Sequence, residues 1–495
     1  MARVVVVGAG LGGLAAAARL ADLGHVVTVL EQASVVGGQV GTFSRAGFTF
    51  DTGPTLLTLP AVYRDLFRKT GRPLERELEL TPVEPARRYR FADGVELDLP
   101  NASRPRTTRT LDAVLGPGSG AQWDGLLRRG EHTWRILRQP FVESAPAAAD
   151  LTRLAMRPAG IRALRAGGSL RALAQQCLPD ARLRAMLESH AGSEDPRHAA
   201  AAYAAIPYLE DTFGTWRVEG GMHRLADALH RRAETGGAVV RTSVEAAEIL
   251  MSGDRVSGVR LTGDGETLPA DIVVSNAHAR HLYGRLLGPR GPSRERRKLT
   301  RAGLASSVFS ILLALRGRTA GLPHRTVLFT GDPEAELDAL FGAEAHPVDD
   351  PTVSVSASDD PALRPSADTE TWVVDVRSPR HGSAGPGTTD WQADGLADSY
   401  ADRVLAVLAS RGLDVRHRVL WRVLRTPADL EVETRSPGGV VEGPGPSGAR
   451  AMRRRAANRS PVKGLFLVGA STRPGGGVPF VGLSANIVAD LVGRA

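Results

Sequence analysis

The chain has 495 residues, of which 42% are hydrophobic and 23% charged, so a wholly disordered protein is excluded and roughly two to four structural units are expected. The formal net charge is +8, and only three of the 62 basic residues are lysine; either GC-rich coding or attraction to an anionic surface would explain such an arginine excess. Aromatic residues make up only 5% and no nucleic-acid-binding motif is present, so nucleic acid is not expected as a partner, and the single cysteine, Cys177, excludes an internal disulfide and a cysteine-built metal site.

The N-terminal stretch has the pattern of a strand, a glycine-rich turn, a helix and a second strand. The apolar run at residues 4–7 predicts a buried parallel strand, and the alanine-rich residues 14–23 predict a helix. Between them stands G-x-G-x-x-G, in which the first glycine makes a tight turn, the second lets the backbone approach a pyrophosphate, and the third lets the helix pack on the strand. The helix N-terminus would face the phosphate charge. The expected cofactor contacts here are Gly8, Gly10, Leu11, Gly12 and Gly13.

An acidic residue follows the second expected strand. Glu31 stands 18 residues after Gly13, where an acid hydrogen-bonds a ribose hydroxyl and disfavours a 2′-phosphate. Glu31 and its neighbour Gln32 are therefore expected to contact the ribose end of the cofactor. The ligand is predicted to be an adenine dinucleotide, and this motif alone does not separate NAD from FAD.

The next segment begins with "GGQVGT" at residues 37–42, followed by "GFTFDTGPT" at 47–55. This pattern resembles the flavin-dependent amine oxidase and carotenoid desaturase superfamily, whose members place G-G-R-x-x-T at the first of these positions. The resemblance implies cofactor contacts at Gly38, Gln39 and Thr42, with glutamine in place of the usual arginine and therefore without one charge-assisted bond. By the same resemblance, Gly53, Pro54 and Thr55 would lie near the flavin ring.

A middle block also matches this superfamily. Glycines at 220–221 open an expected helix, a strand follows at 238–241, and the resemblance implies that the backbone of Val244 contacts the adenine. Residues 256–261, 263–265 and 270–275 predict a strand, a hairpin turn and a strand that returns the chain to the dinucleotide domain.

The C-terminal segment contains a second glycine-rich loop, "GASTRPGGGVP" at residues 469–479. It resembles the signature of the bacterial-type phytoene and carotenoid desaturases, with an expected strand at 465–468 that adds to the N-terminal sheet and a helix from about Leu483. An NAD enzyme needs only the first loop, so FAD is the expected cofactor, bound without a covalent link because Cys177 is far from both loops in sequence. The implied contacts are Gly469, Ala470, Gly477 and Val478.

These segments predict an α/β fold with a Rossmann-type FAD-binding domain made of residues 1–85, 215–280 and 426–495. The intervening residues, 86–214 and 281–425, would form a substrate and membrane-facing domain of mixed α+β structure with a helical cap. Its elements would include helices within 145–190 and strands of a mixed sheet at "FSILLALRG" and "TWVVDVRSP" that floor a cavity. The acidic, proline-containing residues 340–370 are expected as a surface loop.

The resemblance implies an oxidoreductase that introduces C=C bonds into a long acyclic isoprenoid by hydride transfer to flavin, with a quinone or O2 as possible electron acceptor. A polyene isomerase, a saturase, a terminal-methyl oxygenase, an amine oxidase and a non-catalytic lipid carrier remain as alternatives. The scattered histidines give no metal site, and no residue is singled out as catalytic; these histidines include His132, His190, His278, His324 and His381.

The expected location is cytoplasmic, at the inner face of the cell membrane. No signal peptide precedes the first strand, and no stretch reaches the ~18 apolar residues of a spanning helix. A long polyene does not dissolve in water, so we expect the protein to collect its substrate as a peripheral protein at the membrane surface.

Overall fold

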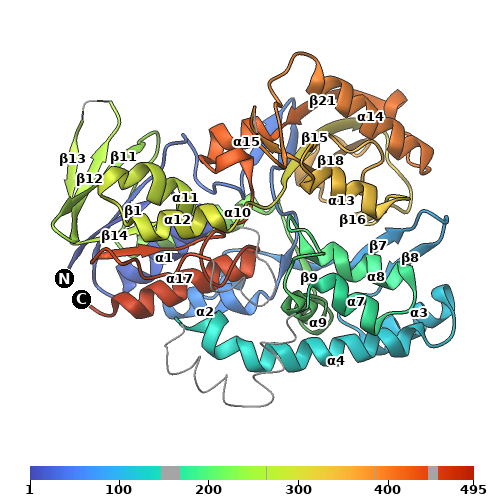
Figure 1. Cartoon of the computed structure of the whole chain (residues 1–495), viewed down its shortest axis with the longest axis horizontal. Coiled ribbons are helices and arrows are strands. Elements are labelled where there is room, and N and C mark those ends of the chain that lie inside the picture. The colour runs from blue at the N-terminus through green and yellow to red at the C-terminus, as the bar shows by residue number, and fades with distance from the viewer. Residues whose placement is uncertain (146–167, 264, 384, 444–454) are drawn as a thin grey trace.

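The computed structural model describes residues 1–145, 168–263, 265–383, 385–443 and 455–495. Two large sheets organise these residues, one of five and one of seven strands. In Figure 1 the five-stranded sheet lies on the left with both termini, and the seven-stranded sheet lies at the upper right. The α/β fold expected from the sequence is confirmed.

The five-stranded sheet is parallel throughout and is assembled from three distant parts of the chain. Its strand order is β10-β2-β1-β14-β22. The strands are β1 (Arg3–Val7), β2 (Val26–Leu30), β10 (Val239–Arg241), β14 (Ile272–Ser275) and β22 (Leu465–Leu467). The C-terminal strand pairs with β14, which confirms that the C-terminal segment completes the N-terminal sheet.

Three helices cover one side of this sheet: α1 (Leu11–Asp22), α10 (His223–Thr235) and α17 (Val478–Val492). Helix α1 packs against both others, and its small alanine side chains are fully buried at the contact. Helix α17 begins at Val478, earlier than the expected start near Leu483, because Pro479 fits the first helical turn, where its missing N–H is not needed.

The segment between β10 and β14 forms a small antiparallel sheet of β11 (Ala246–Ser252), β12 (Arg255–Leu261) and β13 (Thr267–Pro269). The chain then enters β14, so the expected return to the dinucleotide sheet is confirmed.

The seven-stranded sheet has the order β21-β15-β18-β17-β16-β7-β8. Only the β16–β7 pair is parallel, so the sheet is mixed, as expected. Its strands are β7 (Arg87–Arg90), β8 (Glu96–Leu99), β15 (Ser307–Arg316), β16 (Arg325–Leu328), β17 (Val353–Ala357), β18 (Thr369–Ser378) and β21 (Val419–Arg425).

Strand β17 lies inside residues 340–370, so the prediction of a surface loop there is wrong. Val353 and Val355 are fully buried and alternate with serines, which is the period of a strand. Prolines and acidic residues lie on both sides of this short alternation and dominate the local composition, so the sequence pattern indicated a loop.

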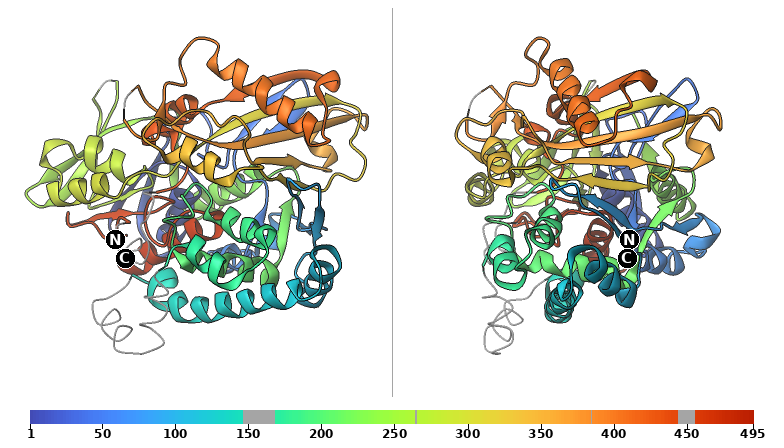
Figure 2. Two further views of the ribbon diagram at one scale, coloured as in Figure 1. Left: turned by 45° about the vertical axis from the view of Figure 1, so that its right-hand side comes forward. Right: turned by 90° about the vertical axis from the view of Figure 1, so that its right-hand side faces the viewer.

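Helices cover the two faces of the seven-stranded sheet differently. Helix α14 (Leu396–Ser410) packs its apolar side on one face, against Phe309, Trp372 and Val374 among others. Figure 2 shows α14 above the sheet and the helices of residues 104–213 on the opposite side. Those helices are α3 (Arg104–Leu115), α4 (Ser119–Leu137), α7 (Leu170–Cys177), α8 (Ala181–Glu188) and α9 (Ala205–Phe213). Part of the predicted helical region, residues 146–167, lies outside the described residues.

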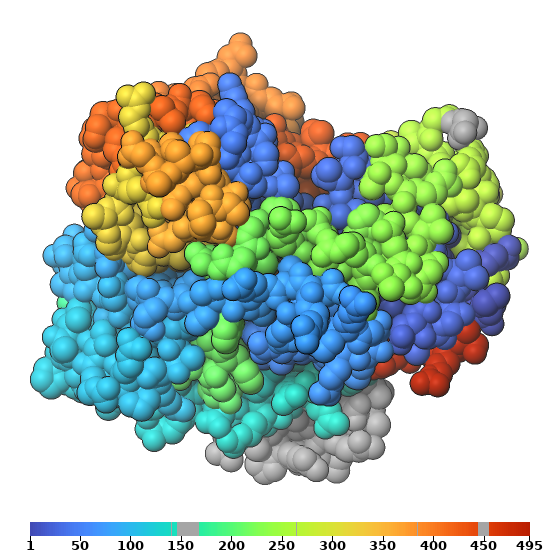
Figure 3. Space-filling model, turned by 180° about the vertical axis from the view of Figure 1, so that it is seen from behind, coloured from blue at the N-terminus to red at the C-terminus, as the bar shows by residue number. Residues whose placement is uncertain are grey.

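Short elements join the two parts. A three-stranded sheet of β5 (Leu57–Thr58), β9 (Thr215–Val218) and β6 (Leu80–Pro82) binds the N-terminal segment to the middle segment, and Figure 3 shows these segments side by side on the rear face. The remaining elements are β3 (Thr42–Arg45), β4 (Phe48–Asp51), α2 (Ala61–Lys69), α11 (Ala279–His281), α12 (Ser293–Arg301), α13 (Pro333–Phe341), β19 (Arg380–His381), β20 (Thr388–Thr389) and α15 (Pro427–Thr434). Among the described residues, no helix combines the length and the apolar character that crossing a bilayer requires.

Candidate functional site

A cavity of about 260 Å³ opens at the carboxyl ends of β1, β14 and β22, and the glycine-containing segments at 8–13, 37–42 and 469–479 line it. Ligands of open α/β sheets bind at this edge. The predicted residues that line the cavity are Gly8, Gly10, Leu11, Gly12, Glu31, Gln32, Gly38, Gln39, Pro54, Val244, Gly469, Ala470, Gly477 and Val478.

The glycines of the first loop are required by a close approach to Asn276, which directly follows β14. A Cβ atom on Gly10 would lie 2.6 Å from Asn276 Nδ2, and one on Gly12 would lie 2.6 Å from Asn276 Oδ1. Gly8 has φ +96°, a conformation that favours glycine. The cavity wall is therefore bare backbone next to the N-terminus of α1, which fits the pyrophosphate of a dinucleotide.

The remaining predicted contacts lie elsewhere. Gly13 packs α1 on β1, since a Cβ there would lie 2.0 Å from the carbonyl oxygen of Gly8. Thr42 is exposed at the start of β3. Gly53 and Thr55 line a second, larger cavity described below. Their contacts with a cofactor stay predictions.

Glu31 is 8% exposed and bonds to backbone on both sides of its strand end. Its Oε2 accepts a hydrogen bond from Ala9 N at 2.7 Å, and its Oε1 accepts one from Ala33 N at 2.9 Å. Its carbonyl oxygen accepts a bond from Val244 N at 2.8 Å, which places Val244 in the cavity wall. A carboxylate oxygen has a second lone pair, so Glu31 can hold the loop and still accept a ribose hydroxyl.

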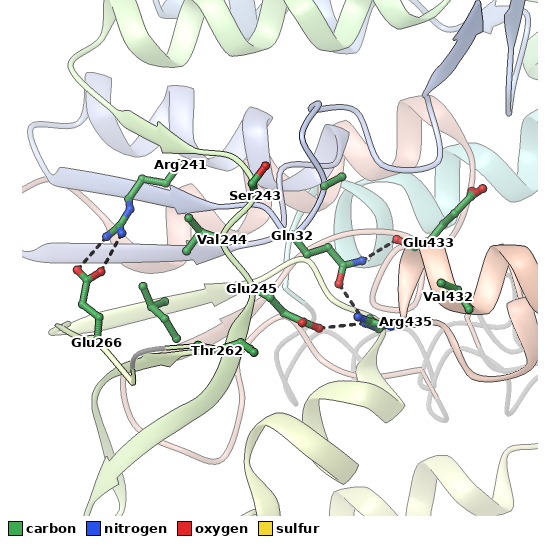
Figure 4. Close-up of a pocket in the computed structure, with 13 residues that line it drawn as sticks. Gln32, Arg241, Ser243, Val244, Glu245, Thr262, Glu266, Val432, Glu433 and Arg435 are labelled. Atoms are coloured by element: carbon green, nitrogen blue, oxygen red, sulfur yellow. Dashed lines mark hydrogen bonds and ion pairs between the residues drawn. The ribbon is translucent and has the colours of Figure 1, made fainter.

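The outer end of this cavity adjoins another of about 750 Å³, and the two share Gln32, Val244, Glu245, Glu433 and Arg435 in their walls. Figure 4 shows this outer cavity. Arg435 Nε donates to Gln32 Oε1 at 3.1 Å and to Glu245 Oε1 at 3.0 Å. An arginine thus joins the three segments where the dinucleotide cavity meets solvent.

Gln39, the residue that replaces the usual arginine, makes a different contact. Its Nε2 donates to the carbonyl oxygen of Val441 at 2.9 Å. The side chain therefore ties the N-terminal loop to the segment that precedes β22, and both residues line the cavity.

Asp51 joins the motif "GFTFDTG" to the segment that follows the glycines at 220–221. Its buried carboxylate accepts hydrogen bonds from Met222 N at 2.8 and 3.0 Å, at the N-terminus of α10. Gly221 has φ +96°, and a Cβ there would lie 2.9 Å from Asp51 Oδ1. The acid supplies the cap that helix α10 lacks in its own sequence.

A second cavity of about 840 Å³ lies between the seven-stranded sheet and helices α7 and α8. It meets the dinucleotide cavity at residues that line both: Gln39, Pro54, Thr434, Val441 and Glu442. A cofactor held in the first cavity would present one end to the second.

Glu442 is the acidic residue at this junction, and no motif of the sequence pointed to it. Its carboxylate accepts a hydrogen bond from Ser193 Oγ at 3.4 Å, and burial raises its pKa. A Cβ on Gly476 would lie 2.6 Å from its carboxyl carbon, so the C-terminal glycine loop packs directly on it. Arg455 lies near and pairs with buried Glu194, whose pKa is raised to about 8 by burial.

Two buried histidines near the cavities have lowered pKa values. Burial lowers the pKa of His278, in the wall of the dinucleotide cavity, to about 3, and the pKa of His324 to about 4. No three His, Cys, Asp or Glu side chains of the described part of the chain are grouped so that they could hold a metal ion. Cys177 lies on α7, where Arg129 Nη1 contacts its sulfur at 3.1 Å, and it does not line the dinucleotide cavity.

Comparison with known proteins agrees with this geometry. Residues 11–360 match the family model of flavin-containing amine oxidoreductases. The chain is 31% identical to the 4,4'-diapolycopene oxygenase of Methylomonas sp, over 99% of this chain and 98% of that protein. It is also 31% identical to the zeta-carotene-forming phytoene desaturase of Myxococcus xanthus, over 99% of this chain and 93% of that protein. An oxidoreductase structure from Methanosarcina mazei has the same fold, with a TM-score of 0.65 at 20% identity, covering 99% of this chain and 100% of that one.

Replacing Glu31 by Gln should weaken binding of FAD. In the wild type, each carboxylate oxygen of Glu31 accepts a hydrogen bond, one from Ala9 N and one from Ala33 N. In glutamine an NH2 group replaces one of these oxygens, so one backbone N–H faces a donor. The clash displaces the carboxylate position that would accept the ribose hydroxyl. A hydrogen bond to a charged acceptor contributes ~1.5–3 kcal/mol, so we expect the Kd for FAD, measured by fluorescence titration, to rise about 10- to 150-fold.

Glu245→Gln is the matched control, since Glu245 lines the same cavity but pairs with Arg435 at a partly exposed site. It should change the affinity by less than ~1 kcal/mol. Equal effects of the two substitutions would show that Glu31 has no special part in holding the cofactor.

Proposed function

Since the chain belongs to the family of flavin-containing amine oxidoreductases, and within it to the phytoene and carotenoid desaturases, we propose that it is an FAD-dependent enzyme that introduces C=C bonds into a long acyclic isoprenoid. The observation that carries the proposal is the junction of the two cavities. The dinucleotide cavity opens through Gln39, Pro54 and Glu442 into a larger chamber suited to part of a long substrate.

FAD would be held along the carboxyl edge of the five-stranded sheet. Glu31 and Val244 would contact the adenosine end, the loop from Gly8 to Gly12 the pyrophosphate, and the loop that ends at Gly477 the flavin end. The binding would be non-covalent, because Cys177 does not line this cavity. We assign the predicted FAD-binding domain to residues 1–85, 215–280 and 426–495, since each segment contributes to the cavity wall.

Desaturation removes two hydrogens from adjacent carbons, one as a hydride and one as a proton. Bound FAD supplies the two-electron acceptor for the hydride. Glu442, as a carboxylate at the junction, would take the proton, and Ser193 Oγ would hold the carboxylate in place. A quinone or O2 would then reoxidise the cofactor. The apolar part of the chamber wall, which includes Phe91, Val327 and Phe329, would keep water away from the reacting carbons.

The product mass tests the reaction. Protein with FAD is added to liposomes that carry acyclic thirty- or forty-carbon polyenes, with a quinone as acceptor. We expect the product to lose hydrogen in pairs, as measured by mass spectrometry. A gain of oxygen would indicate an oxygenase, a gain of hydrogen a saturase, and an unchanged mass with a new retention time an isomerase. No change with any polyene, from protein that holds reducible flavin, would contradict the proposed substrate class.

Glu442→Gln should lower kcat by about 10²- to 10⁴-fold, the usual contribution of a positioned base, without loss of bound FAD. Burial raises the pKa of Glu442, and the carboxyl acts as a base only when deprotonated. The wild-type kcat should therefore rise with pH through a pKa above that of an ordinary glutamate, and the variant should lack this rise.

Glu334→Gln serves as the control, because Glu334 lines the rim of the same chamber with a side chain that is 61% exposed. It should keep the wild-type pH profile. An unchanged profile in the Glu442 variant would exclude Glu442 as the proton acceptor.

We also propose that the protein binds the membrane surface peripherally. Transfer of a forty-carbon polyene into water costs about 30 kcal/mol at ~0.8 kcal/mol per carbon, so the substrate must pass directly from a bilayer. The arginine-rich composition would favour anionic lipid at ~1 kcal/mol per residue close to the surface.

Flotation with anionic liposomes checks this. The protein should float with the vesicles at low salt and detach at high salt, because screening weakens the attraction. Protein that stays at the bottom of the gradient at low salt would refute membrane binding.

A further inference from the structure

The floor of the substrate chamber carries a set of polar side chains beside apolar ones such as Val327 and Phe329, although the chamber belongs to an enzyme class that handles hydrocarbon chains. Alternate residues of the seven-stranded sheet face it, and the register places polar side chains next to one another across five strands, β21, β15, β18, β17 and β16. Ser310 pairs with Arg425 on one side and Asp375 on the other, and Asp375 pairs with Ser354. One step along, Ser356 pairs with Arg325. All six line the chamber.

Arg325 differs from the other arginines of the chamber wall. The wall contains seven arginines, and in the described structure six of them form ion pairs or hydrogen bonds, such as Arg87 with Glu210 and Arg377 with Glu336. The other four arginines with partners are Arg171, Arg182, Arg184 and Arg425. The guanidinium of Arg325 has no such partner among the described residues, and its Nε is buried without an acceptor.

Two polar groups on the neighbouring strands also have unused hydrogen-bonding capacity. Ser354 Oγ is buried without a partner. Asp375 accepts one bond, from Ser310 Oγ at 2.6 Å, and burial raises its pKa while burial lowers the pKa of Arg325. A hydrocarbon chain over these groups would leave them unpaired, at ~1–3 kcal/mol for each buried group. A cationic amine would be repelled by Arg325.

These polar side chains extend to the cofactor end of the chamber. Ser356, the cross-strand neighbour of Arg325, accepts a hydrogen bond from Thr55 Oγ1 at 3.3 Å. Thr55 follows Pro54, which lines both cavities. A group bound at Arg325 would therefore lie near the junction where FAD is proposed to face the substrate.

We propose that the substrate is an acyclic isoprenoid with an oxygen-bearing end group, and that Arg325 recognises this oxygen, with Asp375 and Ser354 as its neighbours. Arg325 donates hydrogen bonds to the oxygen. A hydroxyl group would in turn donate to Asp375 or Ser354, whereas a carbonyl group would use the donors alone. This inference rests on the proposed function and specifies its substrate.

The test compares three acyclic polyenes of equal chain length and conjugation: a hydrocarbon, a terminal alcohol and a terminal aldehyde. The FAD-loaded full chain should turn over at least one oxygenated polyene with a kcat/KM about tenfold or more above that of the hydrocarbon. Arg325→Met should remove this preference by lowering kcat/KM for the oxygenated polyene while that for the hydrocarbon stays the same or rises. Arg325→Lys, which keeps the charge, should retain part of the preference.

Arg316→Met is the matched control, since Arg316 ends β15 of the same sheet and does not line the chamber. FAD content and melting temperature show whether each variant is folded. The preference of the alcohol over the aldehyde, or the reverse, shows whether Asp375 accepts a hydrogen bond from the substrate.

Equal kcat/KM values for hydrocarbon and oxygenated polyenes in the wild type would overturn the inference, as would an equal loss for both in Arg325→Met. If no polyene is turned over, the proposed function fails, but equilibrium binding still tests Arg325. Quenching of flavin fluorescence by each polyene would then report the affinities, and equal affinities for hydrocarbon and oxygenated polyenes would reject the role of Arg325.

Discussion

The pairing of β22 with β14 is the contact on which the rest of the site depends. Three residues of each strand are in register, from Val273 with Leu465 to Ser275 with Leu467, and Val468 N then donates to the carbonyl oxygen of Ser275. This short ladder brings the second glycine loop to Asn276 and the first glycine loop. Without it the cavity would lack the wall that the second glycine loop forms, and α17 would not pack on α1.

Side chains alternate between the two faces of the seven-stranded sheet, so that one face forms an apolar core and the other lines the chamber. Odd positions of β15, such as Phe309 and Ile311, join the apolar core under α14, and the polar Ser310 between them faces the chamber. A one-residue shift in register would exchange the two faces, burying charges against α14. The core under α14 therefore fixes which side chains face the chamber.

Much of the dinucleotide cavity could be predicted because its requirements are local. A glycine is needed where φ is positive, as at Gly8, or where a Cβ atom would collide with a neighbour, as at Gly10 and Gly13, so these three residues carry the signal in their spacing alone. Asn276 was within reach of the same reasoning, since it directly follows a buried parallel strand, where polar residues often meet the ligand.

The chamber residues could not be predicted in this way. Arg325, Asp375 and Glu442 come from separate segments, and no pattern singles any of them out, although Asp375 lies in "TWVVDVRSP", which was expected to floor the cavity. Only the tertiary arrangement shows which arginine lacks a partner. Strand β17 was missed because its short alternation is surrounded by prolines and acids. Gln39 stands where the family usually has arginine, and its hydrogen bond is to Val441, 402 residues further along the chain.

The strand order also determines when the dinucleotide sheet can be completed during synthesis on the ribosome. Strand β14 begins at Ile272 and β22 at Leu465, so a nascent chain carries four strands of the dinucleotide sheet long before the fifth is synthesised. Throughout that interval one edge of β14 exposes unpaired backbone N–H and C=O groups. The complete cavity wall can therefore form only after the C-terminal segment has been synthesised.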